Sequence, residues 1–136
     1  MKIFIYNLRD FDEKYFFDQL EEEYGYSYTG YEGYQTVENI PMVKGHEAVS
    51  ILFSECTDEM LEKFAENGVK YLLTRSVGTN HINLDKCKEL GIRVGRSEYS
   101  PSSVANYAIM LMLMVCRRFG HIMKRVEAQD YSFKNK

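Results

Sequence analysis

The turn Ser76-Val77-Gly78 is the part of this 136-residue chain whose residue types best suit ligand binding. It follows a largely apolar run, residues 69–74, that is typical of a buried strand. Its backbone N–H groups should therefore lie at the carboxyl edge of a parallel sheet, without ladder partners, where they can bind an anion. Gly78 would let a ligand approach because it has no Cβ. The alternative is a glycine that only eases a tight turn.

Other groups that could carry chemistry are scattered. The three histidines, His46, His81 and His121, lie on different expected elements, without the carboxylate or cysteine spacing of a metal site. His81 follows the glycine turn and could approach a ligand, although an ordinary backbone hydrogen bond is the more common use of a loop histidine. None of the nine glycines forms a G-x-G, the start of a dinucleotide-binding turn. We therefore assign no catalytic residue, no metal ligand and no cofactor-binding residue.

Charge and composition exclude several classes of partner. The net charge is −3 and the pI about 5.6, which argues against nucleic acid. The longest apolar run, residues 108–116, is half of what a bilayer requires, so no membrane partner is expected. Three cysteines without C-x-x-C spacing suit a reducing compartment. Met1-Lys2 leads directly into a strand pattern rather than a signal peptide, and we expect a cytoplasmic protein.

Strand and helix patterns alternate over the first 100 residues. Asp10 and Glu13 resemble a capping pair, and Thr57 is a good N-cap. A third, brief helix should close at Gly91. The expected strands are residues 3–6, 26–29, 48–53, 69–74 and 92–94; the expected helical faces comprise Phe16, Leu20 and Tyr24, then Met60, Leu61, Phe64 and Ala65, then Leu84, Cys87 and Leu90. This order predicts an α/β fold, a flavodoxin-like open parallel five-stranded sheet of order 2-1-3-4-5 with helices on both faces.

A long apolar helix follows the sheet. Ser100 is a suitable N-cap and Pro101 suits the first helical position. Between Val104 and Cys116 only Asn106 is clearly polar, so the helix needs burial on every side. We expect a homo-oligomer, most simply a two-fold dimer, through the helix from Pro101 to Arg118. The expected division is a domain of residues 1–100, followed by an interdomain helix and linker at 101–136.

Taken together, the order of elements from Tyr71 to Arg118, the turn from Ser76 to Leu84 and the Tyr99-Ser100-Pro101 motif resemble a known family. It is the N-terminal substrate-binding (catalytic) domain of the D-isomer-specific 2-hydroxyacid dehydrogenases, nearest their D-lactate dehydrogenase branch. Residues 125–131 also resemble the segment that leads into the family's nucleotide-binding domain. That domain would begin just past Lys136, so the chain is expected to be truncated before it.

The resemblance implies a role for particular residues. The amides of Val77 and Gly78 would hold the carboxylate of a small 2-oxo or 2-hydroxy acid, and Tyr99 would line the same cleft. Residues 51–53 correspond to the region that shapes the pocket for the substrate side chain. The family's NAD site and its catalytic arginine, histidine and glutamate would lie in the absent portion. Asn80 and Asn106 stand where relatives commonly carry acidic residues.

Two readings of the function follow. The first is the substrate-recognition half of an NAD-dependent D-2-hydroxyacid dehydrogenase, not catalytically competent alone. The second is a non-enzymatic flavodoxin-like module that binds a small carboxylate or serves oligomerisation. A phosphorylation receiver is disfavoured because the expected strands end in Tyr6-Asn7 and Phe53-Ser54 rather than in acidic residues. A flavin carrier is disfavoured because residues 7–10 lack the Ser, Thr and Gly content of a phosphate loop.

Overall fold

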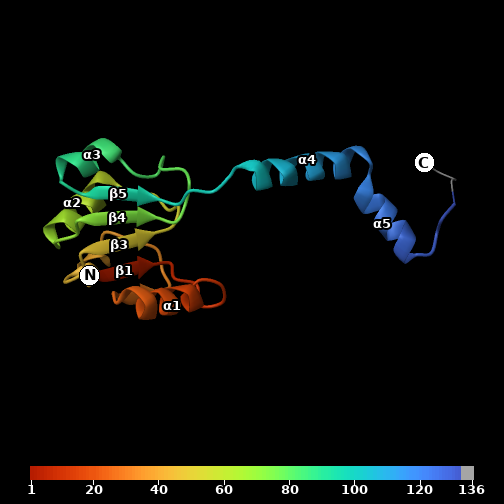
Figure 1. The fold of residues 1–136 in the computed structure, drawn as a ribbon. Coiled ribbons are helices and arrows are strands. Elements are labelled where there is room, and N and C mark those ends of the chain that lie inside the picture. Colours follow the sequence, from red (N-terminus) through yellow and green to blue (C-terminus); the bar gives the residue numbers. More distant parts are fainter. Residues whose placement is uncertain (133–136) are drawn as a thin grey trace. The chain divides into compact units, whose positions relative to one another are not determined.

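The computed structural model describes residues 1–132, which contain five parallel strands in the predicted order β2-β1-β3-β4-β5 (Figure 1). The chain divides into two compact units, Met1–Glu98 and Tyr99–Lys136. The strands are β1 Lys2–Tyr6, β2 Ser27–Tyr31, β3 Ala48–Ile51, β4 Tyr71–Thr74 and β5 Arg93–Arg96. The helices of the first unit are α1 Lys14–Tyr24, the 3-10 helix η1 Ile40–Val43, α2 Asp58–Glu66 and α3 Leu84–Glu89.

One face of the sheet carries most of the core. Side chains from alternate positions of β1, β3 and β4 pack there against η1, α2 and α3. Phe64 of α2 and Leu72 of β4 are fully buried, and Tyr6 is buried with its hydroxyl donating to the carbonyl of Asn39 at 3.3 Å. Burial raises the pKa of the Tyr6 phenol, so this group stays neutral. This layer holds the carboxyl ends of the central strands in a fixed position.

The opposite face is covered only in part. Ile3, Ile5 and Ala48 form a small cluster there, against which Phe17 of α1 packs. The face of α1 that the periodicity favoured is exposed instead, with Phe16 at 60% and Leu20 at 37%. The strand predicted to be buried at residues 69–74 is buried on one face only within the sheet unit, where Leu73 of β4 is 37% exposed.

Local signals fix most element boundaries. Thr57 caps α2 through a bond from the Met60 N–H, as predicted, and Gly25 ends α1 with a φ of 66°. The predicted capping pair at α1 is wrong: α1 begins at Lys14, and no side chain caps it. Glu13 instead accepts from Arg9 and Arg75, a tertiary use that outcompetes capping.

The second unit holds two helices, α4 Ser102–Cys116 and α5 Phe119–Glu127. Helix α4 begins one residue later than predicted, with Pro101 rather than Ser100 at the N-cap, although Ser100 Oγ accepts from the Ser102 N–H at 3.3 Å. No residue of α4 is buried, although the pattern calls for burial on every side. The helical conformation is interrupted at Arg118, whose φ is 50°. Helix α5, which follows, was not predicted from the sequence. No helix within residues 1–132 has the length and apolar character needed to cross a membrane.

Candidate functional site

The loop of residues 75–82 follows the carboxyl end of β4. The backbone carbonyl oxygens of residues 76–79 in this loop accept hydrogen bonds from within the protein. The Ser76 carbonyl accepts from the Ser97 N–H at 3.2 Å, and the Val77 carbonyl accepts from Arg96 Nη1 at 3.4 Å. The Gly78 carbonyl accepts from Ser76 Oγ at 2.8 Å, and the Thr79 carbonyl from the Ile82 N–H at 3.0 Å. Four consecutive acceptors are therefore satisfied within the protein.

The backbone N–H groups of this loop differ from its carbonyl oxygens in their hydrogen bonding. Among residues 1–132, the N–H groups of Val77 and Gly78 donate no hydrogen bond, nor do the other loop amides from Ser76 to His81. In a trans peptide the N–H points opposite to the C=O, so carbonyls that bond to the protein direct their N–H groups the other way. Val77 is half-buried and Gly78 is exposed. The loop thus presents donors without acceptors, which suits an anion rather than a cation.

Gly78 occupies a position where the fold does not require glycine. Its φ lies outside the left-handed region, and a Cβ built there would meet no atom within 4 Å. By contrast, Gly68 and Gly91 have φ values of 89° and 73°, which only glycine adopts at low cost. The reading of Gly78 as a residue that merely eases a tight turn therefore loses its physical basis. What a Cβ at residue 78 would occupy is the open space beside the free amide.

Arg75 fixes the start of the loop. Its guanidinium donates to the carbonyls of Tyr6 and Asn7 at 3.0 and 2.9 Å, to Ser50 Oγ at 3.0 Å, and to Glu13 Oε1 at 3.2 Å. Burial lowers the Arg75 pKa and the neighbouring Glu13 raises it, and an arginine remains charged at neutral pH in any case. One side chain thus ties β4 to the ends of β1 and β3.

A second group of contacts lies on the other side of the loop. Thr74 Oγ1, in a residue that is 2% exposed, donates to the Leu52 carbonyl at 2.8 Å. The same oxygen lies 2.7 Å from Ser76 Oγ and 3.0 Å from His81 Nε2. The His81 carbonyl accepts from the Cys56 N–H at 2.9 Å. Both ends of the loop are therefore held by the two central strands and the segments that follow them.

An accessible positive charge beside the loop comes from β5. Arg96 donates to the Val77 carbonyl, and its side chain is 53% exposed. Its carboxylate neighbour, Glu98, lies 4.0 Å away on an 84% exposed side chain, so the pair is weak. A cavity of about 230 Å³ beside the loop is lined by Thr79, Leu84, Val94, Gly95 and Arg96. The site therefore combines backbone donors with a cationic side chain that remains accessible.

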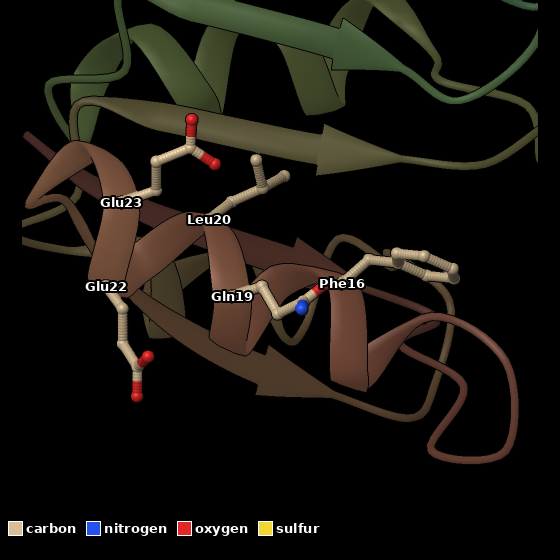
Figure 2. A pocket seen from close by; sticks show the side chains of 5 residues that line it. All are labelled: Phe16, Gln19, Leu20, Glu22 and Glu23. Carbon is tan, nitrogen blue, oxygen red and sulfur yellow. The ribbon is translucent and has the colours of Figure 1, made fainter.

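A larger hollow of about 460 Å³ lies along α1 but suits an acid poorly (Figure 2). One helix supplies its whole lining, which comprises Phe16, Gln19, Leu20, Glu22 and Glu23. Figure 2 shows Glu22 and Glu23 pointing to opposite sides of the helix, with no basic side chain among the labelled residues. Two carboxylates would repel a carboxylate ligand. We therefore place the candidate site at the loop of residues 75–82.

The predicted binding residues divide between the two units. Val77 and Gly78 lie together on the loop, whereas Tyr99 is the first residue of the second unit and is 59% exposed. Residues 51–53 span the end of β3 and the start of the segment after it, where Ile51 and Leu52 are buried and Phe53 is 65% exposed. Sequence reasoning gave no role to Arg75 or Thr74, whose partners lie far away in the sequence. Their polar character at the carboxyl end of an apolar strand was the available signal.

Cofactor and metal sites were tested against the same residues. Within residues 1–132, no cluster of three or more metal-ligating side chains is present. The loop after β1 does not fit the phosphates of a dinucleotide, because it has no G-x-G and places Arg9 in ion pairs with Asp12 and Glu13 at 3.1 and 2.9 Å.

Comparison with known proteins agrees with the resemblance in the sequence. The family model for the D-isomer specific 2-hydroxyacid dehydrogenase catalytic domain matches residues 3–132. An aromatic 2-oxoacid reductase of Clostridium sporogenes is 36% identical over 97% of this chain, which corresponds to 40% of that protein. The D-lactate dehydrogenase of Escherichia coli K12 is 32% identical over 98% of the chain and 41% of its own length.

A solved structure gives the same fold. D-2-hydroxyisocaproate dehydrogenase superposes with a TM-score of 0.80 and 28% identity, over 96% of this chain and 40% of that one. The chain therefore spans about two fifths of the length of these relatives. Its sheet order and the match over residues 3–132 lead to one conclusion. This chain belongs to the D-isomer specific 2-hydroxyacid dehydrogenase family and corresponds to that family's catalytic domain.

Proposed function

We propose that this chain is the substrate-recognition part of an NAD-dependent D-2-hydroxyacid dehydrogenase, with a D-lactate-like substrate. In this proposal the Val77 and Gly78 N–H groups hold the carboxylate of a small 2-oxo or 2-hydroxy acid. The observation that carries it is the loop in which four consecutive carbonyls are bonded while these two amides remain free. A carboxylate accepts such bonds well, and each bond to a charged group contributes about 1.5–3 kcal/mol.

Further residues have supporting roles in this proposal. Arg96 adds positive charge beside the Val77 peptide, and Arg75 keeps the loop in register with β1 and β3. Tyr99 contributes to the same cleft when the second unit is in place. Residues 51–53 shape the part of the pocket that receives the substrate side chain. Gly78 leaves room for the ligand, consistent with the open space at its Cβ position.

The hydride-transfer chemistry is proposed to lie outside these residues. A nicotinamide cofactor, when bound, supplies or accepts the hydride, and its site would be in a nucleotide-binding domain. The chain matches 40–41% of the relatives' length, and its glycines form no G-x-G. We therefore propose that residues 1–100 form the recognition domain and that 101–136 form an interdomain helix and linker. Alone, this chain should bind the acid but not oxidise or reduce it.

The assembly and the compartment are part of the same proposal. Ile109, Leu113 and Val115 of α4 are 53%, 59% and 78% exposed, which favours a homo-oligomer that covers the helix from Pro101 to Arg118. This exposed apolar helix also keeps a pure oligomerisation module open as the second candidate function. All three cysteines are free, which fits a cytoplasmic protein.

Titration of the ¹⁵N-labelled chain with pyruvate tests the recognition role. We expect the Val77 and Gly78 amide signals to shift together, with a Kd of about a millimolar, and acetone, which lacks the carboxylate, to cause no shift. Gly78→Ala should keep the fold, because its Cβ meets no atom, but should weaken binding by about tenfold. Gly120→Ala is the matched control, since its Cβ also meets no atom and it lies on α5. Pyruvate shifts confined to other amides would reject the proposal.

A further inference from the structure

We propose that His81 is a positioning residue of the carboxylate loop, and that it acts as a hydrogen-bond donor through its Nε2–H tautomer. The inference deepens the proposed function and rests on it for the ligand. Its basis is the group formed by Thr74, Ser76 and His81, together with the carbonyls of Leu52 and Gly78. None of these three side chains was assigned a role by the family pattern.

A count of protons assigns the tautomer. Four contacts at 2.7–3.0 Å join Thr74 Oγ1 to the Leu52 carbonyl, Ser76 Oγ and His81 Nε2, and Ser76 Oγ to the Gly78 carbonyl. The two hydroxyls carry one proton each, and the carbonyls only accept. Two protons satisfy at most two of the four contacts. A third proton in this group can come only from His81 Nε2. The Nε2–H tautomer therefore makes three of the four contacts hydrogen bonds, whereas the Nδ1–H tautomer makes only two.

The proton donated by His81 Nε2 matters for the loop because it leaves the Thr74 and Ser76 hydroxyl protons available to carbonyl oxygens. When His81 occupies an acceptor site of Thr74 Oγ1, Thr74 can keep its own proton on the buried Leu52 carbonyl. Ser76 then has its proton available for the Gly78 carbonyl, which fixes the peptide that follows the Gly78 amide. With the Nδ1–H tautomer, Nε2 is instead a further acceptor, which competes with the Leu52 carbonyl for the Thr74 proton and leaves the group one hydrogen bond short. His81 therefore holds the loop in shape without touching the ligand.

The chain contains an internal comparison in His46. Its Nδ1 lies 3.1 Å from the Val43 carbonyl, which can only accept, so His46 must carry its proton on Nδ1. Its Nε2 is then the acceptor for the Thr29 hydroxyl at 2.9 Å. The two histidines of the first unit should therefore show opposite tautomers under the same conditions. A general preference of imidazole for one tautomer cannot produce this difference.

Long-range ¹H–¹⁵N spectra of the full 136-residue chain at pH 8 test the assignment directly. We expect a protonated Nε2 at His81 and a protonated Nδ1 at His46. His81→Leu should shift the Gly78 amide signal and weaken pyruvate binding by about tenfold, the effect of one lost hydrogen bond. His81→Gln keeps an N–H donor on a side chain of similar reach, so it should restore affinity to within about threefold of the wild type.

The outcomes separate the two proposals. A protonated Nδ1 at His81, or wild-type pyruvate affinity in His81→Leu, would overturn the positioning role. Equal loss in the Leu and Gln variants would also overturn it, because the donor would then be irrelevant. If pyruvate does not bind the wild type at all, the proposed function fails. The tautomer and the Gly78 amide shift in His81→Leu then still decide the role of His81.

Discussion

The sheet unit and helix α4 use the same kinds of side chain and treat them in opposite ways. In the sheet unit, Phe64 and Leu72 are fully buried between the strands and the helices α2 and α3. In α4, Leu113 and Val115 are 59% and 78% exposed, and no residue of the helix is buried. Apolar side chains are therefore not buried by their composition alone. Their burial requires another apolar surface to pack against.

Exposure of apolar side chains on α4 is costly compared with the stability of a domain. Each large apolar side chain left in water forgoes roughly 1.5–3 kcal/mol, against a net stability of about 5–15 kcal/mol for a domain. Several such side chains lie along α4, including Ile109, Met112 and Leu113. The sheet unit can close its main core from its own sequence. Within its own unit, helix α4 buries none of its residues.

A matched pair of leucine truncations should give the largest effect in this comparison. Leu72→Ala removes a fully buried side chain and should lower the free energy of unfolding of the sheet unit by about 2–5 kcal/mol. Leu113→Ala removes the same atoms from an exposed position and should change it by less than about 0.5 kcal/mol. Urea unfolding followed by near-ultraviolet circular dichroism of the tyrosines measures both. Similar losses in the two variants would show that α4 is part of the same cooperative core.

A charged substitution tests whether a second copy covers α4. Leu113→Glu would place a carboxylate in the interface and should raise the dissociation constant of the dimer by about a hundredfold. Tyr24→Glu is the control. The Tyr24 side chain is large and 67% exposed, comparable to Leu113 at 59%, but it lies on α1 rather than α4. Sedimentation velocity over a range of micromolar concentrations measures the equilibrium. A wild-type chain that stays monomeric throughout would contradict the assembly proposal.

Fold prediction succeeded where the signal was local. The order of the five strands followed from alternating patterns, and Thr57 and Gly91 were identified because capping depends on a few neighbouring residues. It failed where a distant residue decided the outcome. Asp10 and Glu13 were expected to form a capping pair, but Arg75, sixty-two positions from Glu13 in the sequence, engages the Glu13 carboxylate. The exposed face of α1 was misjudged for the same kind of reason, since periodicity does not say which strands a helix will cover.

At the candidate site too, local features were predicted and contacts with distant residues were not. The turn at Val77 and Gly78 was found from a strand followed by a glycine, a pattern within one segment. The bonds that hold its carbonyls come from Arg96 and Ser97, on the neighbouring strand and just after it, and could not be read from the turn itself. Helix α5 was missed although Phe119, Ile122 and Met123 have helical spacing. The left-handed residue Arg118 separates it from α4, and no glycine or proline at that position signals the break.

Thiol labelling gives the smallest perturbation and compares the two regions within one molecule. Burial raises the pKa of the Cys56 thiol to about 12, and burial also raises that of Cys87, so both stay neutral and inaccessible at pH 8. Cys116, at the end of α4, is exposed. A maleimide should therefore modify one thiol rapidly in the native chain and all three in urea, as counted by mass spectrometry.

The concentration dependence of that labelling sharpens the comparison further. If a second copy covers α4, the rate at Cys116 should fall as the protein concentration rises through the dissociation constant, whereas Cys56 and Cys87 should stay unreactive at every concentration. Leu113→Glu should abolish the dependence without exposing the two core thiols, because it weakens the dimer and leaves the sheet unit unchanged. A constant rate at Cys116 in a chain that sediments as a dimer would place the interface away from the end of α4. Rapid labelling of Cys56 in the native chain would instead show that the main core opens readily, which the 3% exposure of Cys56 within that core argues against.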